Sequence, residues 1–231
     1  MCGRARLAVP AEDLAEIFDA VLPAPLDTSA NLNIAPTDSV LVLRMNEVGE
    51  REIVPMRWGL VPFYEEDFDR AKPLINARVE TAATRPAFRE AFEHKRCCVL
   101  ADGFYEWKHQ QVAGSRKVRK QPYLIQRPGG AAFAMAGLWQ RWHGKSGTGA
   151  RDVVRESCTV ITRDAAPPVE VLHDRMPVIL EGADIAAWLD PAVDPVAAQH
   201  VLDRALTEGW VTTPLDRVPD PPARRQLGLF G

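Results

Sequence analysis

The sequence predicts an α+β fold, with a mostly antiparallel, barrel-like sheet core and flanking helices. Strand-like segments group in the middle of the chain, and helical patterns lie toward both ends. The strict alternation of strands and helices that would indicate a parallel sheet is absent. The chain has 231 residues, 46% of them hydrophobic, which suits one core. We therefore expect a single domain over residues 1–222 and a C-terminal tail over 223–231.

The first third of the chain predicts two helices and a hairpin. Apolar residues recur at helical spacing over Ala11–Leu22, between Pro10 and Pro23, and indicate an amphipathic helix. Ser39–Met45 and Arg51–Pro55 flank a polar turn that contains Gly49, which is typical of a hairpin. A second helix is predicted over Arg85–Phe92.

Short strands fill the middle of the chain. They are predicted over Arg96–Ala101, Phe104–Lys108, Pro122–Gln126, Ala131–Trp139 and Val153–Thr162. Asp-Gly, Pro-Gly-Gly and a Gly/Ser-rich loop at residues 144–150 separate them. Helical patterns return at Ala183–Leu189 and Pro195–Leu206, and the Pro-rich segment after Val218 is expected to be irregular.

Composition excludes several classes of protein. With 28 Lys plus Arg against 31 Asp plus Glu, the formal charge is −3, so a nucleic-acid partner would need a local basic patch. No apolar stretch approaches the roughly 20 residues of a membrane span. The chain starts without the apolar segment of a signal peptide, so we expect a cytoplasmic protein.

The cysteines and the common motifs indicate no metal and no cofactor. Cys97 and Cys98 are adjacent in a predicted strand, so their side chains point to opposite faces and cannot share an ion; we expect both to be buried. Phosphate-loop, dinucleotide, zinc and nucleophile-elbow motifs are absent. Four basic residues between two strands, Arg116, Lys117, Arg119 and Lys120, indicate a solvated hairpin tip more than a nucleic-acid contact.

Four segments remain in which polar residues interrupt apolar sequence. They are Met-Cys-Gly-Arg at 1–4, Asn-Ala-Arg-Val-Glu-Thr at 76–81, Ala-Asp-Gly-Phe-Tyr-Glu-Trp at 101–107 and His-Asp-Arg-Met-Pro at 173–177. Their order and spacing resemble the SOS response-associated peptidase (SRAP) family across nearly the whole chain. Asn-Ile-Ala-Pro at 33–36, Arg-Trp-Gly-Leu-Val-Pro at 57–62 and Thr162 add to the resemblance.

The resemblance implies a sensor of abasic sites in single-stranded DNA that acts in the DNA damage response and crosslinks to DNA through Cys2. Once Met1 is removed, Cys2 carries an α-amine with a pKa of about 7.7 to 8.0 beside a thiol near 8.5. The amine can form an imine with the aldehyde of an abasic sugar, and the thiolate can then close a thiazolidine on the same carbon. The resemblance also implies removal of Met1 by the protein itself and an abasic-site lyase activity. We expect no cofactor, a monomer, and association with the nucleoid on damaged DNA.

Three further residues are candidates for the chemistry. Strand alternation places Glu106 beside Phe104, where desolvation would raise the pKa of the carboxyl and suit it to proton transfer. The resemblance implies that His173, with an imidazole pKa near 6.5, protonates the sugar ring oxygen to open it, with Asp174 or a backbone carbonyl orienting the ring. Asn76 would position the amine or the sugar through its amide.

The resemblance also implies the residues that bind DNA. Arg4 and Arg78 would hold phosphates on either side of the damaged nucleotide, and Thr162 would donate to a phosphate oxygen. Pro36 and Trp58 would shape the groove and stack on bases, although Trp58 is equally suited to the core. Tyr64 is a candidate aromatic wedge, but the four acids among residues 65–69 depart from the family pattern and would repel phosphate.

Two other classes of function remain open. An N-terminal-nucleophile amidotransferase also begins Met-Cys-Gly, but it normally needs an Asn-Gly pair for its oxyanion hole, and none of the four asparagines precedes a glycine. A non-catalytic single-strand-binding module would keep the groove and leave Cys2 without a role. Removal of Met1, measured by mass spectrometry, distinguishes covalent chemistry from such a module.

Overall fold

A closed ring of five strands forms the core of the molecule. The computed structural model describes residues 3–26, 29–111, 118–146 and 151–222. The ring consists of β3 (Ser39–Met45), β4 (Arg51–Trp58), β6 (Arg96–Ala101), β9 (Phe133–Ser146) and β10 (Arg151–Asp164). The strands pair in the order β10, β4, β3, β6 and β9, and β9 pairs again with β10. Within this ring of five strands, the pairing of β4 with β10 is parallel and the other four pairings are antiparallel. The predicted mostly antiparallel, barrel-like core is therefore confirmed.

Three short strands extend this ring at β9 and β10. They are β5 (Asn76–Arg78), β11 (Arg175–Pro177) and β12 (Ile179–Leu180). β5 runs parallel to β10, with Thr162 beside Arg78, and β11 runs antiparallel to the same end of β10, with Thr162 beside Pro177. The end of β10 therefore brings two of the sequence segments of interest, residues 76–81 and 173–177, next to each other.

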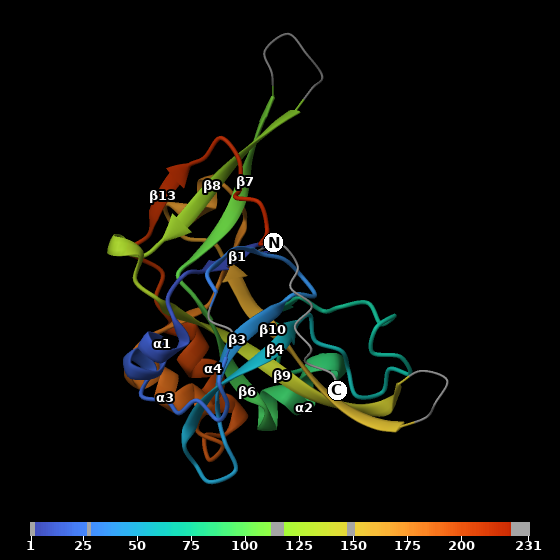
Figure 1. The fold of residues 1–231 in the computed structure, drawn as a ribbon. Helices are drawn as coiled ribbons and strands as arrows, with labels where there is room; N and C mark the ends of the chain where they lie inside the picture. The colour runs from blue at the N-terminus through green and yellow to red at the C-terminus, as the bar shows by residue number, and fades with distance from the viewer. Residues whose placement is uncertain (1–2, 27–28, 112–117, 147–150, 223–231) are drawn as a thin grey trace.

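A second, fully antiparallel sheet carries the start of the chain. It contains β1 (Ala5–Leu7), β2 (Asn31–Ile34), β7 (Gly103–Gln111), β8 (Val118–Gln126) and β13 (Val211–Pro214), in the order β13, β8, β7, β1, β2. Figure 1 shows the β7–β8 hairpin extending well beyond the rest of this sheet. The predicted strands at 104–108 and 122–126 are longer in the structure because they pair with each other over eight residues on each side.

Helices cover the barrel. α1 (Ala11–Phe18), α3 (Ala183–Leu189) and α4 (Pro195–Asp203) are grouped on one side of it, and α2 (Pro86–His94) packs against β6 and β9 (Figure 1). Two 3-10 turns, η1 (Pro128–Gly130) and η2 (Val169–Val171), complete the described elements. The expected helix over 11–22 is wrong beyond Phe18: Asp19 adopts φ 49°, and Val21 pairs with Glu52 of β4 instead of continuing the helix.

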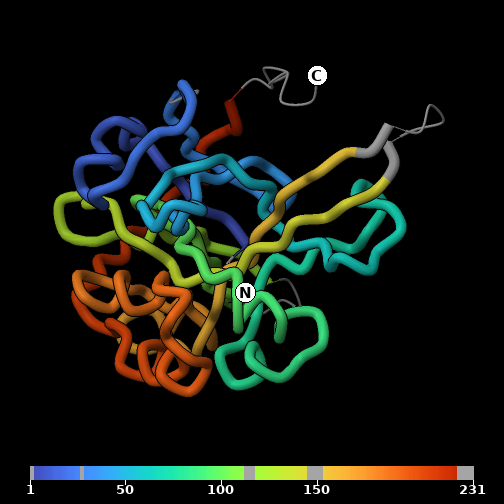
Figure 2. The backbone as a smooth tube through the Cα atoms, turned by 90° about the horizontal axis from the view of Figure 1, so that it is seen from below, coloured from blue at the N-terminus to red at the C-terminus, as the bar shows by residue number. Residues whose placement is uncertain are grey.

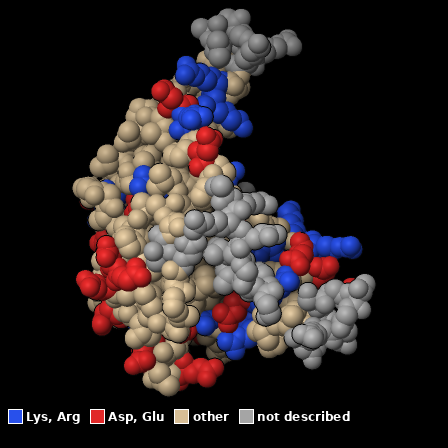
Figure 3. Space-filling model, in the orientation of Figure 1, with Lys and Arg blue, Asp and Glu red and all other residues tan. Residues whose placement is uncertain are grey.

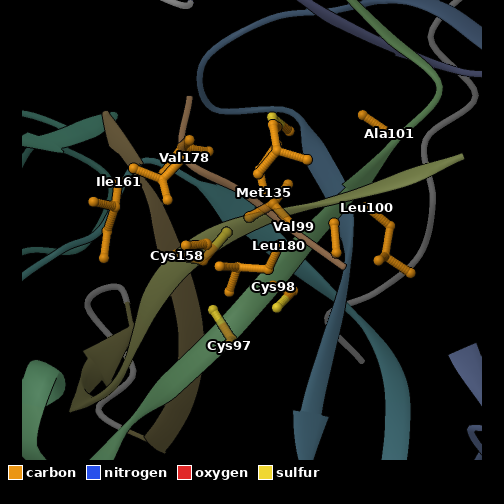
Figure 4. Packing of buried hydrophobic residues seen from close by; sticks show 14 of the residues in the cluster. Cys97, Cys98, Val99, Leu100, Ala101, Met135, Cys158, Ile161, Val178 and Leu180 are labelled. Carbon is orange, nitrogen blue, oxygen red and sulfur yellow. The ribbon is translucent and has the colours of Figure 1, made fainter. Parts of the chain in front are cut away.

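The barrel interior is apolar and contains the described cysteines. Every residue of β6 is buried, including Cys97 and Cys98, as predicted. Figure 4 shows them among Val99, Met135 and Cys158. Burial raises the pKa of the Cys98 and Cys158 thiols well above the ordinary value. These three thiols are therefore packing groups.

The outer ends of β9 and β10 form a two-stranded arm that extends from the barrel (Figure 2). The segment between β4 and β5 packs against this arm through a small separate cluster of buried side chains: Val61, Phe68, Ala71 and Trp142. The indole N–H of Trp142 donates to the carbonyl of Glu65 at 2.7 Å. This contact fixes the segment that contains the acidic residues 65–69.

Candidate functional site

The first described residues lie alongside β7. Ala5 of β1 is opposite Phe104, and the Tyr105 N–H donates to the Arg4 carbonyl at 2.9 Å. Asp102 anchors this strand, because its carboxylate accepts hydrogen bonds from the Arg6 guanidinium and the Ala8 N–H, both at 2.7 Å. Cys2 lies outside the described residues, two positions before Arg4.

Glu106 lies in β7 and is only 3% exposed. It shares a strand face with Phe104, whose ring packs edge-on against Phe133 and Trp210 at centroid distances of 6.4 and 5.7 Å. This burial raises the pKa of Glu106 to about 7, and the negative charge of Asp174 acts in the same direction. At neutral pH the carboxyl is populated in both protonation states, which suits a group that both gives and takes a proton.

His173 follows η2 and is partly buried. Its Nδ1 accepts a hydrogen bond from the Arg175 N–H at 2.9 Å, so the neutral ring carries its proton on Nε2. Burial lowers the pKa of His173 from the ordinary 6.5, which corrects the sequence-based expectation of an unshifted imidazole. An Asp174 carboxylate oxygen lies 2.8 Å from Nδ1 and favours the protonated ring. Asp174 therefore stays a candidate for orienting the protonated ring, whereas the Arg175 N–H bonds Nδ1 of the neutral ring.

Glu106 and His173 line the same cleft. Its volume is about 760 Å³ and its other walls are formed by residues 107–109 of β7, Lys120 of β8, and Val171 and Leu172. The cleft therefore has one carboxyl group that titrates near neutrality, Glu106 on β7, and the imidazole of His173, which comes from the segment between η2 and β11; His109 of β7 adds a second imidazole. This pairing can move protons at a bound electrophile.

Arg175 holds the histidine segment in place, a role that sequence analysis missed. Its guanidinium donates to both carboxylate oxygens of Glu80, at 2.7 and 2.9 Å, and also to Asp164 and to the carbonyl of Thr162. Arg175 is 8% exposed. The signal available in the sequence was a charged residue directly before the apolar run Met-Pro-Val-Ile-Leu. Because these bonds join β11 to β10 and to residues after β5, they fix the position of His173.

Asn76, Arg78 and Thr162 lie together on β5 and β10. Asn76 is partly buried beside Val160, and Arg78 is exposed beside Thr162. Thr162 itself is 3% exposed, and its hydroxyl donates to the Ala77 carbonyl at 3.4 Å. The phosphate contact expected of that hydroxyl does not fit this structure, because the group is buried and bonded to backbone.

The aromatic and proline candidates differ in exposure. Trp58 is 1% exposed and its indole donates to the Ile75 carbonyl at 3.0 Å, so it belongs to the core and has no free face for stacking on a base. Pro36 is partly exposed. Tyr64 is 54% exposed and packs edge-on against Phe63, as a protruding aromatic pair.

Two of the four acids in the 65–69 segment bind other groups of the same protein. Asp69 forms an ion pair with Arg155 through both carboxylate oxygens at 2.8 Å. Asp67 accepts the backbone N–H groups of Asp69 and Arg70, which lowers the pKa of its carboxyl. The repulsion of phosphate expected at this segment is therefore weaker than the acid count implies, because Arg155 offsets the charge of Asp69.

Within the described ranges, no group of three or more His, Cys, Asp or Glu side chains is arranged to hold a metal ion. None of the helices in the described part of the chain combines the length and apolar character that crossing a membrane requires.

Comparison with known proteins relates this arrangement to one family. The family model described as SOS response associated peptidase (SRAP) matches residues 1–218. The chain is similar to the abasic site processing protein YoqW of Bacillus subtilis, with 35% identity over 87% of this chain and 86% of the relative. It is also similar to the abasic site processing protein YedK of Escherichia coli, with 31% identity over 87% and 85% of the two chains.

A solved structure has the same fold. A crystal structure of a protein from Bacteroides thetaiotaomicron matches with a TM-score of 0.77 at 24% identity, and the match covers 93% of this chain and 92% of the other. This likeness confirms the α+β architecture.

Proposed function

The chain belongs to the SOS response associated peptidase family, and we propose on that basis that it senses abasic sites in single-stranded DNA by crosslinking to them through Cys2. The relatives described above are named abasic site processing proteins. The observation that carries the proposal is the cleft in which Glu106 and His173 face each other, beside the strand that leads from the start of the chain.

The pairing of β1 with β7 supports a role for Cys2 at this site. β1 continues the ladder with β7 up to the bond between Tyr105 and Arg4, one residue before Glu106 on β7. Cys2 is two positions before Arg4 in the sequence, and an extended chain advances about 3.3 Å per residue. The α-amine and thiol of Cys2 are therefore within chain reach of the Glu106 carboxyl.

The covalent reaction proceeds in two additions at C1′ of the sugar. The Cys2 amine attacks the aldehyde to give a hemiaminal, which loses water to become an imine. The thiol then adds across the C=N bond, so that sulfur bonds to carbon and nitrogen takes the proton. The product is a five-membered thiazolidine, and one water is released overall.

Glu106 and His173 divide the proton transfers. Glu106, with its pKa of about 7, takes a proton from the amine and returns one to the departing hydroxyl of the hemiaminal. The protonated form of His173 donates from Nε2 to the ring oxygen of the closed sugar; the bond between C1′ and that oxygen breaks, and the C1′ hydroxyl loses its proton to water as the aldehyde forms. Asn76 positions the amine or the sugar, and Arg4 and Arg78 bind flanking phosphates. Pro36 and Tyr64 contact bases.

Two further activities belong to the same proposal. The protein itself hydrolyses the peptide bond after Met1. This cleavage must precede crosslinking, because only a free Cys2 amine can form the imine. The imine also permits β-elimination of the 3′ phosphate, which gives abasic-site lyase activity when ring closure by sulfur fails.

The test is an incubation with a single-stranded oligonucleotide that contains one abasic site, followed by a denaturing gel. A heat-stable adduct is expected, and an intact oligonucleotide should give none. Cys2→Ala should lose the stable adduct while Cys98→Ala, a control in a buried thiol, should keep it. Equal adduct on DNA without an aldehyde would overturn the proposal, as would finding Met1 intact on active protein by mass spectrometry.

The noncovalent contacts have their own measurement. Arg4→Ala and Arg78→Ala should each reduce the slope of log affinity against log salt by about 0.7, the value for one phosphate on single strands. Slopes equal to that of the parent would mean that neither arginine binds a phosphate and that other residues hold the strand.

A further inference from the structure

The β7–β8 hairpin forms one wall of the cleft and is rich in cations. Lys108 and His109 of β7 and Lys120 of β8 line the cleft together with Glu106. His109 is opposite Lys120 in the ladder, and its charge lowers the pKa of His173, which faces it across the cleft. Figure 3 shows Lys and Arg side chains gathered over the exposed part of this hairpin. The solvated hairpin tip expected from the sequence thus continues into the wall of the site.

The charges of this wall are not used inside the protein. Among the described residues, the side chains of Lys108 and Lys120 have no ion-pair or hydrogen-bond partner, although their backbones pair in the β7–β8 ladder. Glu106 is the only carboxylate among the residues that line the cleft, and its pKa of about 7 leaves it partly neutral. The two ammonium groups exceed the combined negative charge of Asp174, which lies 2.8 Å from His173 Nδ1, and of the partly neutral Glu106, and this excess favours an anionic ligand.

The opposite wall is apolar. Val171, which is 61% exposed, and Leu172 face the hairpin. A cleft of about 760 Å³ with apolar side chains on one wall and ammonium groups on the other suits a sugar and its phosphate better than a small inorganic anion. The cleft has room for more than the abasic sugar alone.

Arg78 and the cations of the hairpin belong to different sheets. β10 separates Arg78 on β5 from Arg175 on β11, and His173 precedes Arg175. That places Arg78 two strand spacings, about 10 Å, from the β11 side of the cleft. Arg78 on β5 and the hairpin lysines on β7 and β8 are thus separate groups of cations near the catalytic pair, and an abasic nucleotide has one phosphate on each side.

We infer that Lys108 and Lys120 each bind a backbone phosphate on one side of the abasic sugar, while Arg78 binds on the other side. The inference rests on the proposed function, since it assigns a path to the same DNA strand. Lysine suits this role because its ammonium acts as a mobile point charge that tolerates any sequence. The two lysines would therefore add affinity and position without base preference.

The test compares salt dependence among five proteins: the parent, the double variant Lys108→Gln with Lys120→Gln, the two single variants, and Arg119→Gln. Arg119 is a matched control because it is exposed and adjacent to Lys120 but does not line the cleft. The double variant should lower the salt slope for single-stranded DNA by about 1.4 and each single variant by about 0.7, whereas Arg119→Gln should leave it unchanged. A melting temperature equal to that of the parent would show that these exposed substitutions leave the fold intact.

A second measurement locates the contact on the strand. Abasic oligonucleotides are shortened stepwise from the 5′ or the 3′ end, and the crosslinking rate is measured for each. The parent should lose rate on shortening from both ends, and the double variant should become insensitive at one end only. An unchanged salt slope with unchanged sensitivity at both ends would overturn the inference while the parent still crosslinks. If the parent failed to crosslink, the proposed function would fall, and the salt slopes on intact single strands would still decide whether the lysines bind phosphate.

Discussion

Replacing Glu106 with glutamine should stabilise the fold at alkaline pH while it slows crosslinking. The carboxyl is 3% exposed, and its pKa in the fold is about 7 against an ordinary value of 4.5. Between these two values the folded chain holds a proton that the unfolded chain has released, so the free energy of unfolding falls as pH rises through this window. At about 1.4 kcal/mol per pH unit, the ionised carboxylate costs the fold about 3 kcal/mol above pH 7. Glutamine has nearly the same shape and does not ionise.

The assay is thermal or denaturant unfolding of parent and Glu106→Gln at pH 4 and pH 8. The variant should match the parent at pH 4 and exceed it at pH 8 by about 3 kcal/mol, or roughly 6 to 12 °C in Tm for a chain of this length. Glu80→Gln is the control of opposite sign. The hydrogen bonds from Arg175 lower the pKa of Glu80, so its contribution is present above pH 4.5 and is lost as pH falls. Glu80→Gln should therefore destabilise the fold at pH 8.

A Glu106→Gln protein no more stable than the parent at pH 8 would refute the reasoning, and so would a gain of equal size at both pH values. The first result would mean that the carboxylate is well solvated or compensated in the fold. The second would mean that glutamine packs better for reasons unrelated to charge.

Three other predictions concern the thiols, the histidine and the start of the chain. A thiol reagent should modify at most one cysteine in the folded protein and four after unfolding, because the three described cysteines are fully buried; two fast-reacting thiols in the folded chain would contradict this. His173→Ala should slow crosslinking to a natural abasic site but have a much smaller effect on an aldehyde that cannot cyclise, and equal losses on both substrates would exclude a role in ring opening. Asp102→Asn weakens the bonds from Arg6 and Ala8, so it should lower the free energy of unfolding by about 1.5 to 3 kcal/mol and speed amide hydrogen exchange in β1. Unchanged exchange in β1 would show that the anchor lies elsewhere.

The sequence alone determined the fold class, the family and the candidate residues. Periodicity and turn residues are local, so they located β3, β6 and α3 at their observed bounds, whereas β9 runs to Ser146, well beyond the predicted end at Trp139. They also placed Glu106 on the face of Phe104, because side chains in a strand alternate. The short strands β1, β5 and β11 escaped prediction, since three residues carry too little pattern to be recognised.

Only the tertiary structure decided what environment each candidate occupies. The bond between Arg6 and Asp102 joins residues 96 positions apart, and that between Arg175 and Glu80 joins residues 95 apart, so no local pattern could indicate either. The same holds for the burial that shifts the pKa of Glu106 and removes Trp58 from the surface. Lys120 became a candidate only when the hairpin was seen to form a wall of the cleft. Burial and charge proximity depend on segments that folding brings together from distant parts of the chain, and these two quantities set the chemistry of the site.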